Sequence, residues 1–255
     1  MTQREKAEEL RRLHAAPEPL VLVNAWDAAS ARVVAGAPGC RAIATASWSI
    51  AASRGYGDGE QIPLDEMLDA VGIVARAVEL PVTADLERGF GDAGATVARA
   101  IEVGAVGCNL EDSDESGNLK PVEEHVANVQ AARAAGETAG VPIVINARTD
   151  VFLVGRAFDE AVERARAYLA AGADVVFVPG VSDVATLEQL VIKIRGPISV
   201  FGGANGPTLD ELARLGIPRV SYGPGPLGSA MAALGRTAKT LLGGGDPPPD
   251  LANRP

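Results

Sequence analysis

Short runs of β-branched and other apolar residues alternate along this chain with longer stretches whose apolar residues recur at helical spacing. The intervening stretches, such as 63–78 and 158–171, are predicted to be helices. The apolar runs predict eight strands, at residues 20–26, 42–47, 81–87, 106–112, 142–149, 175–180, 197–203 and 219–224. Strand–helix alternation is typical of a parallel sheet with right-handed crossovers. Eight such units in 255 residues predict a (β/α)₈ TIM barrel, with an open doubly wound sheet as the alternative.

The pattern indicates one domain with short additions at both ends. An extra helix over 3–15 precedes the first strand, and a last helix lies near 226–242. We expect residues 1–243 to form a single barrel domain, and residues 244–255, rich in Gly and Pro, to form a disordered tail.

Two strand-to-helix connections, residues 48–62 and 113–122, are longer than the others. Long polar loops of this kind are where active-site lids occur, and a plain surface loop is the alternative. Each loop follows a predicted strand directly, so a lid here would lie at the carboxyl ends of the strands.

The composition excludes several classes of protein. With a net charge of −10 and a pI near 4.8, the chain lacks the excess of Lys and Arg typical of nucleic-acid-binding proteins. No apolar run has the length of a signal peptide or a membrane span, so we expect a cytoplasmic protein without a membrane partner. Cys40 and Cys108 are too few and too far apart for a disulfide framework, and Cys108 is predicted to lie in the core. His14 and His125 fall among charged neighbours and are predicted to be surface residues.

Acidic residues end two neighbouring predicted strands, at the edge where barrels of this class keep their active sites. Asp85 and Glu87 end one strand on the same face, and Glu111 ends the next. Crowded carboxylates repel one another unless a cation or protons compensate. Carboxylate oxygens without His or Cys favour a hard divalent ion, so these three residues predict a site for Mg²⁺, with Mn²⁺ also possible.

Arg148 ends the following strand beside these acids, and its guanidinium suits a carboxylate or phosphoryl group bidentately. A metal and an arginine in the mouth of a barrel could hold a small dianionic 2-oxo or 2-hydroxy acid. The alternative is that Arg148 only neutralises the acids in an ion-pair network. Trp26, Ser47 and Trp48 come from the ends of the first two strands.

The segment Gly89–Gly94 matches the dinucleotide fingerprint G-x-G-x-x-G. Acids precede this loop and Asp92 lies within it, where a pyrophosphate would have to bind. We therefore interpret it as a tight turn beside the metal site, and a nicotinamide enzyme is a distant alternative.

Three motifs in this order, ADLERGFG (84–91), NLEDS (109–113) and INARTDVFL (145–153), resemble the isocitrate lyase/phosphoenolpyruvate mutase superfamily. The resemblance extends over nearly the whole chain through NAWDAASARVV (24–34), AIATASWSIAASRGYGDGE (42–60) and FVPG (177–180). It implies a (β/α)₈ barrel whose last helix is often exchanged between the subunits of a homodimer or homotetramer. It also implies Mg²⁺-dependent chemistry on C–C or C–P bonds next to a 2-oxo carboxylate, through a metal-stabilised enolate.

The same resemblance implies roles for individual residues. Asp85 would be the direct metal ligand, while Glu87 and Glu111 would hold metal-bound waters. Arg148 would grip the substrate carboxylate, and backbone N–H groups near residues 46–48 would bind its other oxygens. We assign catalysis to Arg148, Asp58 and Glu111, and substrate binding to Trp26, Ala46, Ser47, Trp48, Asp85, Arg148 and Asn205.

The chain departs from the family in three places. Glu87 replaces the family's commoner second aspartate and is one methylene longer, which favours contact through water. Residues 113–122, SDESGNLKPV, lack both the gate cysteine of isocitrate and methylisocitrate lyases and the Pro-Lys-x-Asn-Ser gate of the mutase. Pro179 and Gly180 stand where the lyases have a glutamate and the mutase a histidine. The half of the site that forms an enolate is present, and the half that selects the substrate is altered.

Without the gate cysteine, we favour a lyase or decarboxylase for a small 2-oxo or 2-hydroxy dicarboxylic acid, with an oxaloacetate-like substrate preferred. One alternative is phosphoenolpyruvate mutation or phosphonopyruvate hydrolysis, in which Lys120 and Asn118 would meet the phosphoryl group. Another is a non-catalytic protein that binds 2-oxo acids.

Overall fold

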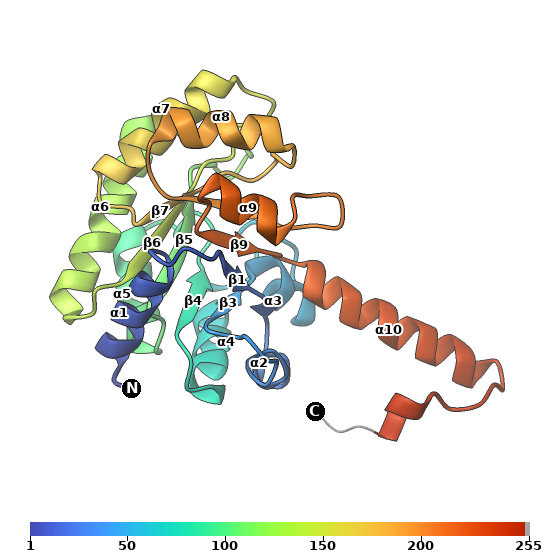
Figure 1. Ribbon diagram of the computed structural model, residues 1–255. Coiled ribbons are helices and arrows are strands. Elements are labelled where there is room, and N and C mark those ends of the chain that lie inside the picture. The colour runs from blue at the N-terminus through green and yellow to red at the C-terminus, as the bar shows by residue number, and fades with distance from the viewer. Residues whose placement is uncertain (253–255) are drawn as a thin grey trace.

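The computed structural model describes residues 1–252 and shows a ring of parallel strands surrounded by helices (Figure 1). The strands are β1 (Leu20–Leu22), β2 (Asn24–Ala25), β3 (Ile43–Thr45), β4 (Val82–Asp85), β5 (Gly107–Glu111), β6 (Val144–Arg148), β7 (Val175–Phe177), β8 (Ile198–Phe201) and β9 (Arg219–Ser221). This architecture confirms the predicted TIM barrel. All eight predicted strands are present, and the first is divided at Val23, so that β1 pairs with β9 while β2 pairs with β3. One segment of chain thus closes the ring.

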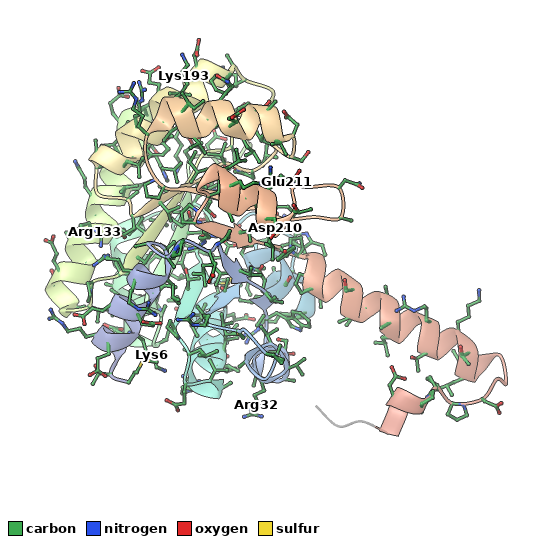
Figure 2. The ribbon with its side chains drawn as sticks, viewed as in Figure 1. Lys6, Arg32, Arg133, Lys193, Asp210 and Glu211 are labelled. Carbon is green, nitrogen blue, oxygen red and sulfur yellow. The ribbon has the colours of Figure 1, made fainter. Side chains whose placement is uncertain are left out.

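Apart from the first helix, which precedes β1, and the last, which projects away, the helices follow strands and cover the outside of the ring (Figure 1). The helices are α1 (Gln3–Leu13), α2 (Ala28–Ala35), α3 (Ser47–Ser53), α4 (Leu64–Ala77), α5 (Ala93–Glu102), α6 (Val122–Ala139), α7 (Phe158–Ala170), α8 (Val184–Ile194), α9 (Leu209–Leu215) and α10 (Gly225–Leu242). The connection expected as a long loop after the second predicted strand therefore begins with a short helix, α3. Charged side chains such as Arg32 and Lys193 point outward from this layer (Figure 2).

The register of the parallel strands brings the polar residues of β4, β5 and β6 into line. Asp85 lies opposite Asn109, and Glu111 lies opposite Arg148. Because side chains alternate along a strand, Asn109 faces the same side as Glu111. Cys108 is fully buried on the other face, as predicted. The sheet itself thus delivers two acids and one arginine to the same end of the barrel.

Both histidines are buried, and the prediction that they lie on the surface is wrong. His14 is 8% exposed at the end of α1, beside the buried guanidinium of Arg219. His125 is fully buried, with its ring centroid 4.6 Å from that of Tyr168 in an edge-to-face pair. Burial lowers the pKa of each imidazole to about 4. Charged neighbours in the sequence misled the prediction, because both helices turn their histidine toward the barrel.

The last helix, α10, projects away from the barrel (Figure 1). Beyond it, Pro249–Ala252 forms one 3₁₀ turn, and residues 253–255 of the predicted tail lie outside the described part of the chain. Among the helices of residues 1–252, none combines the length and the apolar character that crossing a bilayer requires.

Candidate active site

A cavity of about 500 Å³ opens at the carboxyl ends of the strands. Eight of the predicted site residues line it, namely Ala46, Ser47, Trp48, Asp58, Asp85, Glu87, Glu111 and Arg148. Two predicted substrate-binding residues do not. Trp26 is half-buried and packs against the core, and Asn205 is exposed in the loop after β8. Asn24, which is two residues before Trp26, lines the cavity instead.

Asp85 is held at the end of β4 by the start of α3. Its Oδ2 accepts hydrogen bonds from the backbone N–H of Ser47 at 3.0 Å and from the Ser47 hydroxyl at 2.8 Å. The Asp85 N–H donates to Thr45 Oγ1 at 2.9 Å. The resemblance implied that the Ser47 N–H would meet substrate, but here this donor orients Asp85. The carboxylate is therefore fixed before any ligand arrives.

Glu87 occupies a strained turn directly after β4. Its φ of 48° lies in the left-handed region, which is costly for a residue with a side chain and recurs at functional sites. The Glu87 Oε2 atom accepts from the Glu60 N–H at 2.6 Å. Its Oε1 atom is buried and has no hydrogen-bond partner within residues 1–252. The predicted tight turn follows, with φ of 94° at Gly89 and 84° at Gly91.

Glu60 ties the loop before α4 to this turn. One of its carboxylate oxygens accepts from the N–H groups of Arg88 at 3.0 Å and Phe90 at 2.7 Å. The other pairs with the Arg88 guanidinium at 3.2 Å. Because the Glu60 backbone in turn donates to Glu87, the two loops fix each other, and Glu60 positions the carboxylate of Glu87. Sequence reasoning missed Glu60, whose only signal was its place in the family-like segment 42–60.

Arg148 makes ion pairs with two carboxylates. Its Nη1 lies 2.8 Å from Glu111 Oε2, and its Nε and Nη2 donate to Asp150 at 2.6 and 3.1 Å. The guanidinium lies 6.0 Å from the centre of the Phe177 ring. These contacts occupy three of the five N–H donors that an arginine carries. Arg148 therefore pairs with both acids, and within residues 1–252 two of its N–H donors have no partner.

The charges around the cavity leave an excess of negative groups. Asp58, Asp85, Glu87 and Glu111 give four carboxylates in the lining, against two guanidiniums, from Arg88 and Arg148. Burial raises the pKa of Glu87 to about 8, and the charge of Asp85 adds to this effect. Burial likewise raises the pKa of Glu111 to about 7, although Arg148 opposes the shift. These carboxylates hold protons readily unless a cation comes close.

A hard divalent cation fits this donor set. Within residues 1–252, no three acidic, His or Cys side chains converge closely enough to form a ready-made metal cage. Glu87 is drawn toward Glu60 and Glu111 toward Arg148, which suits contact through water rather than direct ligation. The partnerless Oε1 of Glu87 and the firmly held Asp85 offer acceptor oxygens to such an ion. Oxygen donors of this kind match Mg²⁺ or Mn²⁺.

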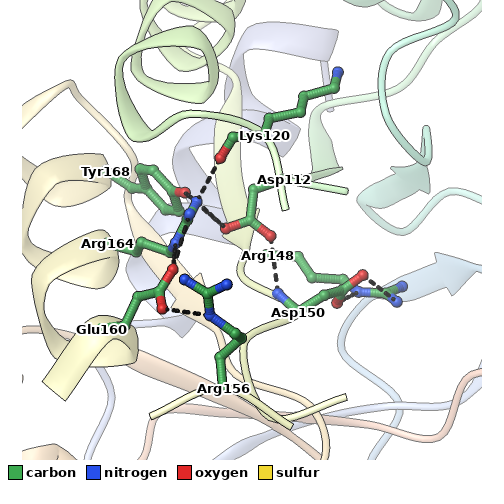
Figure 3. A network of polar contacts seen from close by, with 8 residues as sticks. All are labelled: Asp112, Lys120, Arg148, Asp150, Arg156, Glu160, Arg164 and Tyr168. Carbon is green, nitrogen blue, oxygen red and sulfur yellow. Dashed lines mark hydrogen bonds and ion pairs between the residues drawn. The ribbon is translucent and has the colours of Figure 1, made fainter. Parts of the chain in front are cut away.

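A second polar network lies behind Arg148 and connects it to α7 (Figure 3). Asp112 is fully buried and accepts from the Tyr168 hydroxyl at 2.7 Å and from Arg164 Nη1 at 3.2 Å. Its other oxygen accepts from the Asp150 N–H at 2.9 Å. Asp112 thus holds in place Asp150, the residue that pairs with Arg148. The sequence offered a weak signal for it, because an acid on the outer face of a buried strand needs a partner.

We expect this network to stabilise the fold strongly. Arg164→Met leaves the buried Asp112 charge without its ion-pair partner and is expected to lower the free energy of unfolding by about 3–5 kcal/mol. Tyr168→Phe removes one hydrogen bond to a charged group and is expected to cost about 1.5–3 kcal/mol. Urea unfolding followed by circular dichroism measures both. The matched control is Arg4→Met, whose ion pair with Glu8 is exposed and worth no more than about 1 kcal/mol. Equal losses in Arg164→Met and Arg4→Met would contradict this role.

The segment 113–122 forms a small hairpin whose ends are pinned. Ser113 and Leu119 form an antiparallel bridge, and the Lys120 N–H donates to the Asp112 carbonyl at 2.8 Å. The Ser113 hydroxyl donates to Glu111 Oε1 at 3.0 Å, so the hairpin touches the site at its base. Asn118 and Lys120, the candidate phosphoryl-binding residues, do not line the cavity. The Lys120 Nζ atom instead lies 3.6 Å from Glu124 Oε1.

Comparisons with known proteins show which family the chain resembles. The phosphoenolpyruvate phosphomutase family matches residues 10–242. A Burkholderia cenocepacia J2315 protein of solved structure, provisionally named a phosphonomutase, is 45% identical, with a TM-score of 0.88 over 93% of this chain and 98% of that chain. The 2-methylisocitrate lyase of Escherichia coli K12 is 32% identical over 236 residues, which cover 87% of this chain and 78% of that protein. An oxaloacetate decarboxylase of Bradyrhizobium sp. BTAi1 is 34% identical over 198 residues, 73% of this chain and 67% of the relative.

Proposed function

Because this chain belongs to the phosphoenolpyruvate phosphomutase family, in a superfamily of carbon–carbon lyases and mutases, we propose that it is a Mg²⁺-dependent lyase for small 2-oxo or 2-hydroxy dicarboxylic acids. The observation that carries the proposal is the meeting of Asp85, Glu87 and Glu111 with Arg148 in one cavity. An acidic cluster that needs a cation, beside an arginine with free donors, suits a substrate that bears a carboxylate next to a polarisable oxygen.

Each residue has a separate task in this scheme. Asp85 would hold the metal directly, with Glu87 and Glu111 orienting its waters. When bound, Mg²⁺ would polarise the 2-oxygen of the substrate and stabilise the negative charge that develops as the C–C bond breaks. Arg148 would use its two remaining N–H donors to hold a substrate carboxylate. Ser47 keeps Asp85 in place throughout.

Oxaloacetate is the simplest substrate that meets these conditions. Its C3–C4 bond breaks, C4 leaves as carbon dioxide, and C3 takes a proton to give pyruvate. Water can supply that proton, so the reaction does not need the gate cysteine that residues 113–122 lack. The oxaloacetate decarboxylases among the relatives support this choice. Phosphoryl transfer receives less support, because Lys120 and Asn118 lie away from the cavity lining.

Pyruvate release, coupled to lactate dehydrogenase, tests the proposal with oxaloacetate and phosphonopyruvate offered in parallel. We expect release from oxaloacetate above the rate without enzyme, and loss of that release when EDTA removes the metal. Release from phosphonopyruvate alone would assign the enzyme to C–P chemistry. Tight Mg²⁺-dependent binding of a 2-oxo acid without turnover of either compound would favour a binding protein.

We also propose that the chain assembles as a homodimer or homotetramer through α10, by the helix exchange that the family resemblance implies. Apolar side chains on this projecting helix are exposed, including Met231 at 50% and Leu234 at 60%. Covering them with a second copy would bury apolar surface that water otherwise contacts. Light scattering should give at least twice the chain mass of 26.1 kDa, and Leu234→Asp should shift the protein toward the monomer. A monomeric wild type would contradict the proposal.

A further inference from the structure

Much of the active-site cavity is lined by apolar side chains, in contrast to its acidic residues. The large apolar residues of the lining are Trp48 after β3, Leu153 after β6, Phe177 in β7, Pro179 after β7, Phe201 in β8 and Pro224 after β9. We call these six residues the apolar wall. Leu153 is 54% exposed, Trp48 43% and Phe201 38%, so large apolar surfaces meet water inside a cavity. Apolar and aromatic side chains that line a cavity are typical of sites that bind small molecules.

Glycines build this wall and keep polar side chains out of it. Gly180 has a φ of 88°, and a Cβ added there would lie 3.1 Å from Leu153 Cδ2. Gly223 has a φ of 50°, and a Cβ there would lie 2.7 Å from the Phe201 ring. A side chain at either position would crowd Leu153 or Phe201, so glycine leaves room for these two residues of the apolar wall.

The cavity is also larger than a four-carbon diacid requires. Its volume of about 500 Å³ falls within the range of roughly 300–1,000 Å³ that holds drug-sized ligands. The acidic residues and Arg148 would engage only the charged end of a substrate. Besides Asn24, Arg88, Asn109 and Ser221, most of the other side chains in the lining are apolar. An ionic group placed against those apolar side chains would lose hydration without gaining a partner.

We propose that the substrate carries an alkyl chain of several carbons beyond its 2-oxo acid end, and that this chain packs against the apolar wall. The inference rests on the proposed function for the orientation of the acid end, which Arg148 and the acidic side hold. The apolar wall then selects among 2-oxo or 2-hydroxy acids by the carbon that each one buries. Burial of about two methylene groups corresponds to roughly tenfold in affinity.

Calorimetric titration of the full chain with pyruvate and with 2-oxooctanoate, both in the presence of Mg²⁺, tests this inference. The two acids share the 2-oxo acid end, and neither has the second carboxylate that would leave. We expect 2-oxooctanoate to bind at least about tenfold more tightly. Leu153→Asp should reduce that ratio to below about threefold, since it places a charge against the alkyl chain. The matched control, Ile192→Asp on α8, has a similar exposure of 55% outside the cavity lining and should keep the ratio.

Equal affinities for the two acids, a preference that survives Leu153→Asp, or no detectable binding of 2-oxooctanoate would overturn the inference. The proposed function is decided separately by pyruvate release from oxaloacetate. Tighter binding of 2-oxooctanoate without oxaloacetate turnover would contradict the proposed function and leave the apolar wall as the binding determinant. Turnover of oxaloacetate without tighter binding of 2-oxooctanoate would contradict only the inference about the alkyl chain.

Discussion

Asp85→Ala is expected to lower kcat/KM for oxaloacetate decarboxylation by roughly a thousandfold or more, because a catalytic metal supplies several kcal/mol of transition-state stabilisation. Asp85 is the acid that two donors from Ser47 hold in place at the mouth of the barrel. Removing its carboxylate would take away the direct ligand, and the waters that Glu87 and Glu111 orient would lose their anchor. Steady-state pyruvate release at saturating Mg²⁺ measures the effect.

The control for this variant is Asp65→Ala. Asp65 lies in the first turn of α4, where its side chain is 84% exposed and pairs with Arg99. Surface changes of this kind shift stability little and should leave kcat/KM within about twofold of the wild type. Full activity in Asp85→Ala would be incompatible with a metal held by this carboxylate.

Arg148→Met is expected to lower kcat/KM by roughly a hundredfold or more, since truncating one partner of a buried charge pair costs about 2–5 kcal/mol. The variant loses the two donors assigned to the substrate carboxylate. It also leaves Glu111 and Asp150 without their shared cation, so the free energy of unfolding should fall as well. Arg148→Lys keeps the charge but not the planar fork, and should recover activity only in part.

The double variant Arg148→Met/Asp150→Asn separates the two roles of the arginine. Neutralising Asp150 removes one of the uncompensated charges, so stability against urea should rise relative to Arg148→Met. Activity should stay low, because the donors for the substrate are still missing. Activity that returns together with stability would mean that Arg148 only neutralises the acids.

The barrel and the acidic half of the site could be predicted because both follow from local pattern. Alternation along a strand puts Asp85 at one strand end and Glu111 at the next, and parallel strands bring such ends together. Glu87, predicted at the end of the same strand as Asp85, reaches the cavity from the turn after β4 instead. The register that pairs Glu111 with Arg148 then completes the arrangement. The polar residue at each strand end is indicated by the few positions around it, whereas the register between strands comes from the fold.

The supporting contacts could not be predicted, because they join residues far apart in the chain. Asp112 accepts hydrogen bonds from Tyr168 and Arg164, which lie more than fifty residues later in the sequence. No pattern within a short stretch of sequence indicates such a contact. The burial of His125 follows from the same packing of α6 against α7, where its ring meets Tyr168. Trp26 lies between the end of β2 at Ala25 and the N-cap of α2 at Asp27, so the strand alternation behind its prediction does not reach it.

Equilibrium binding of Mn²⁺, followed by the electron paramagnetic resonance signal of the free ion, tests the central claim without any choice of substrate. The account predicts one saturable site per chain in the wild type, competed by Mg²⁺ and unchanged in Asp65→Ala. It also predicts that Asp85→Ala loses this site. No saturable site in the wild type, or a site that Asp85→Ala retains in full, would contradict the assignment of this cavity as a divalent-metal centre.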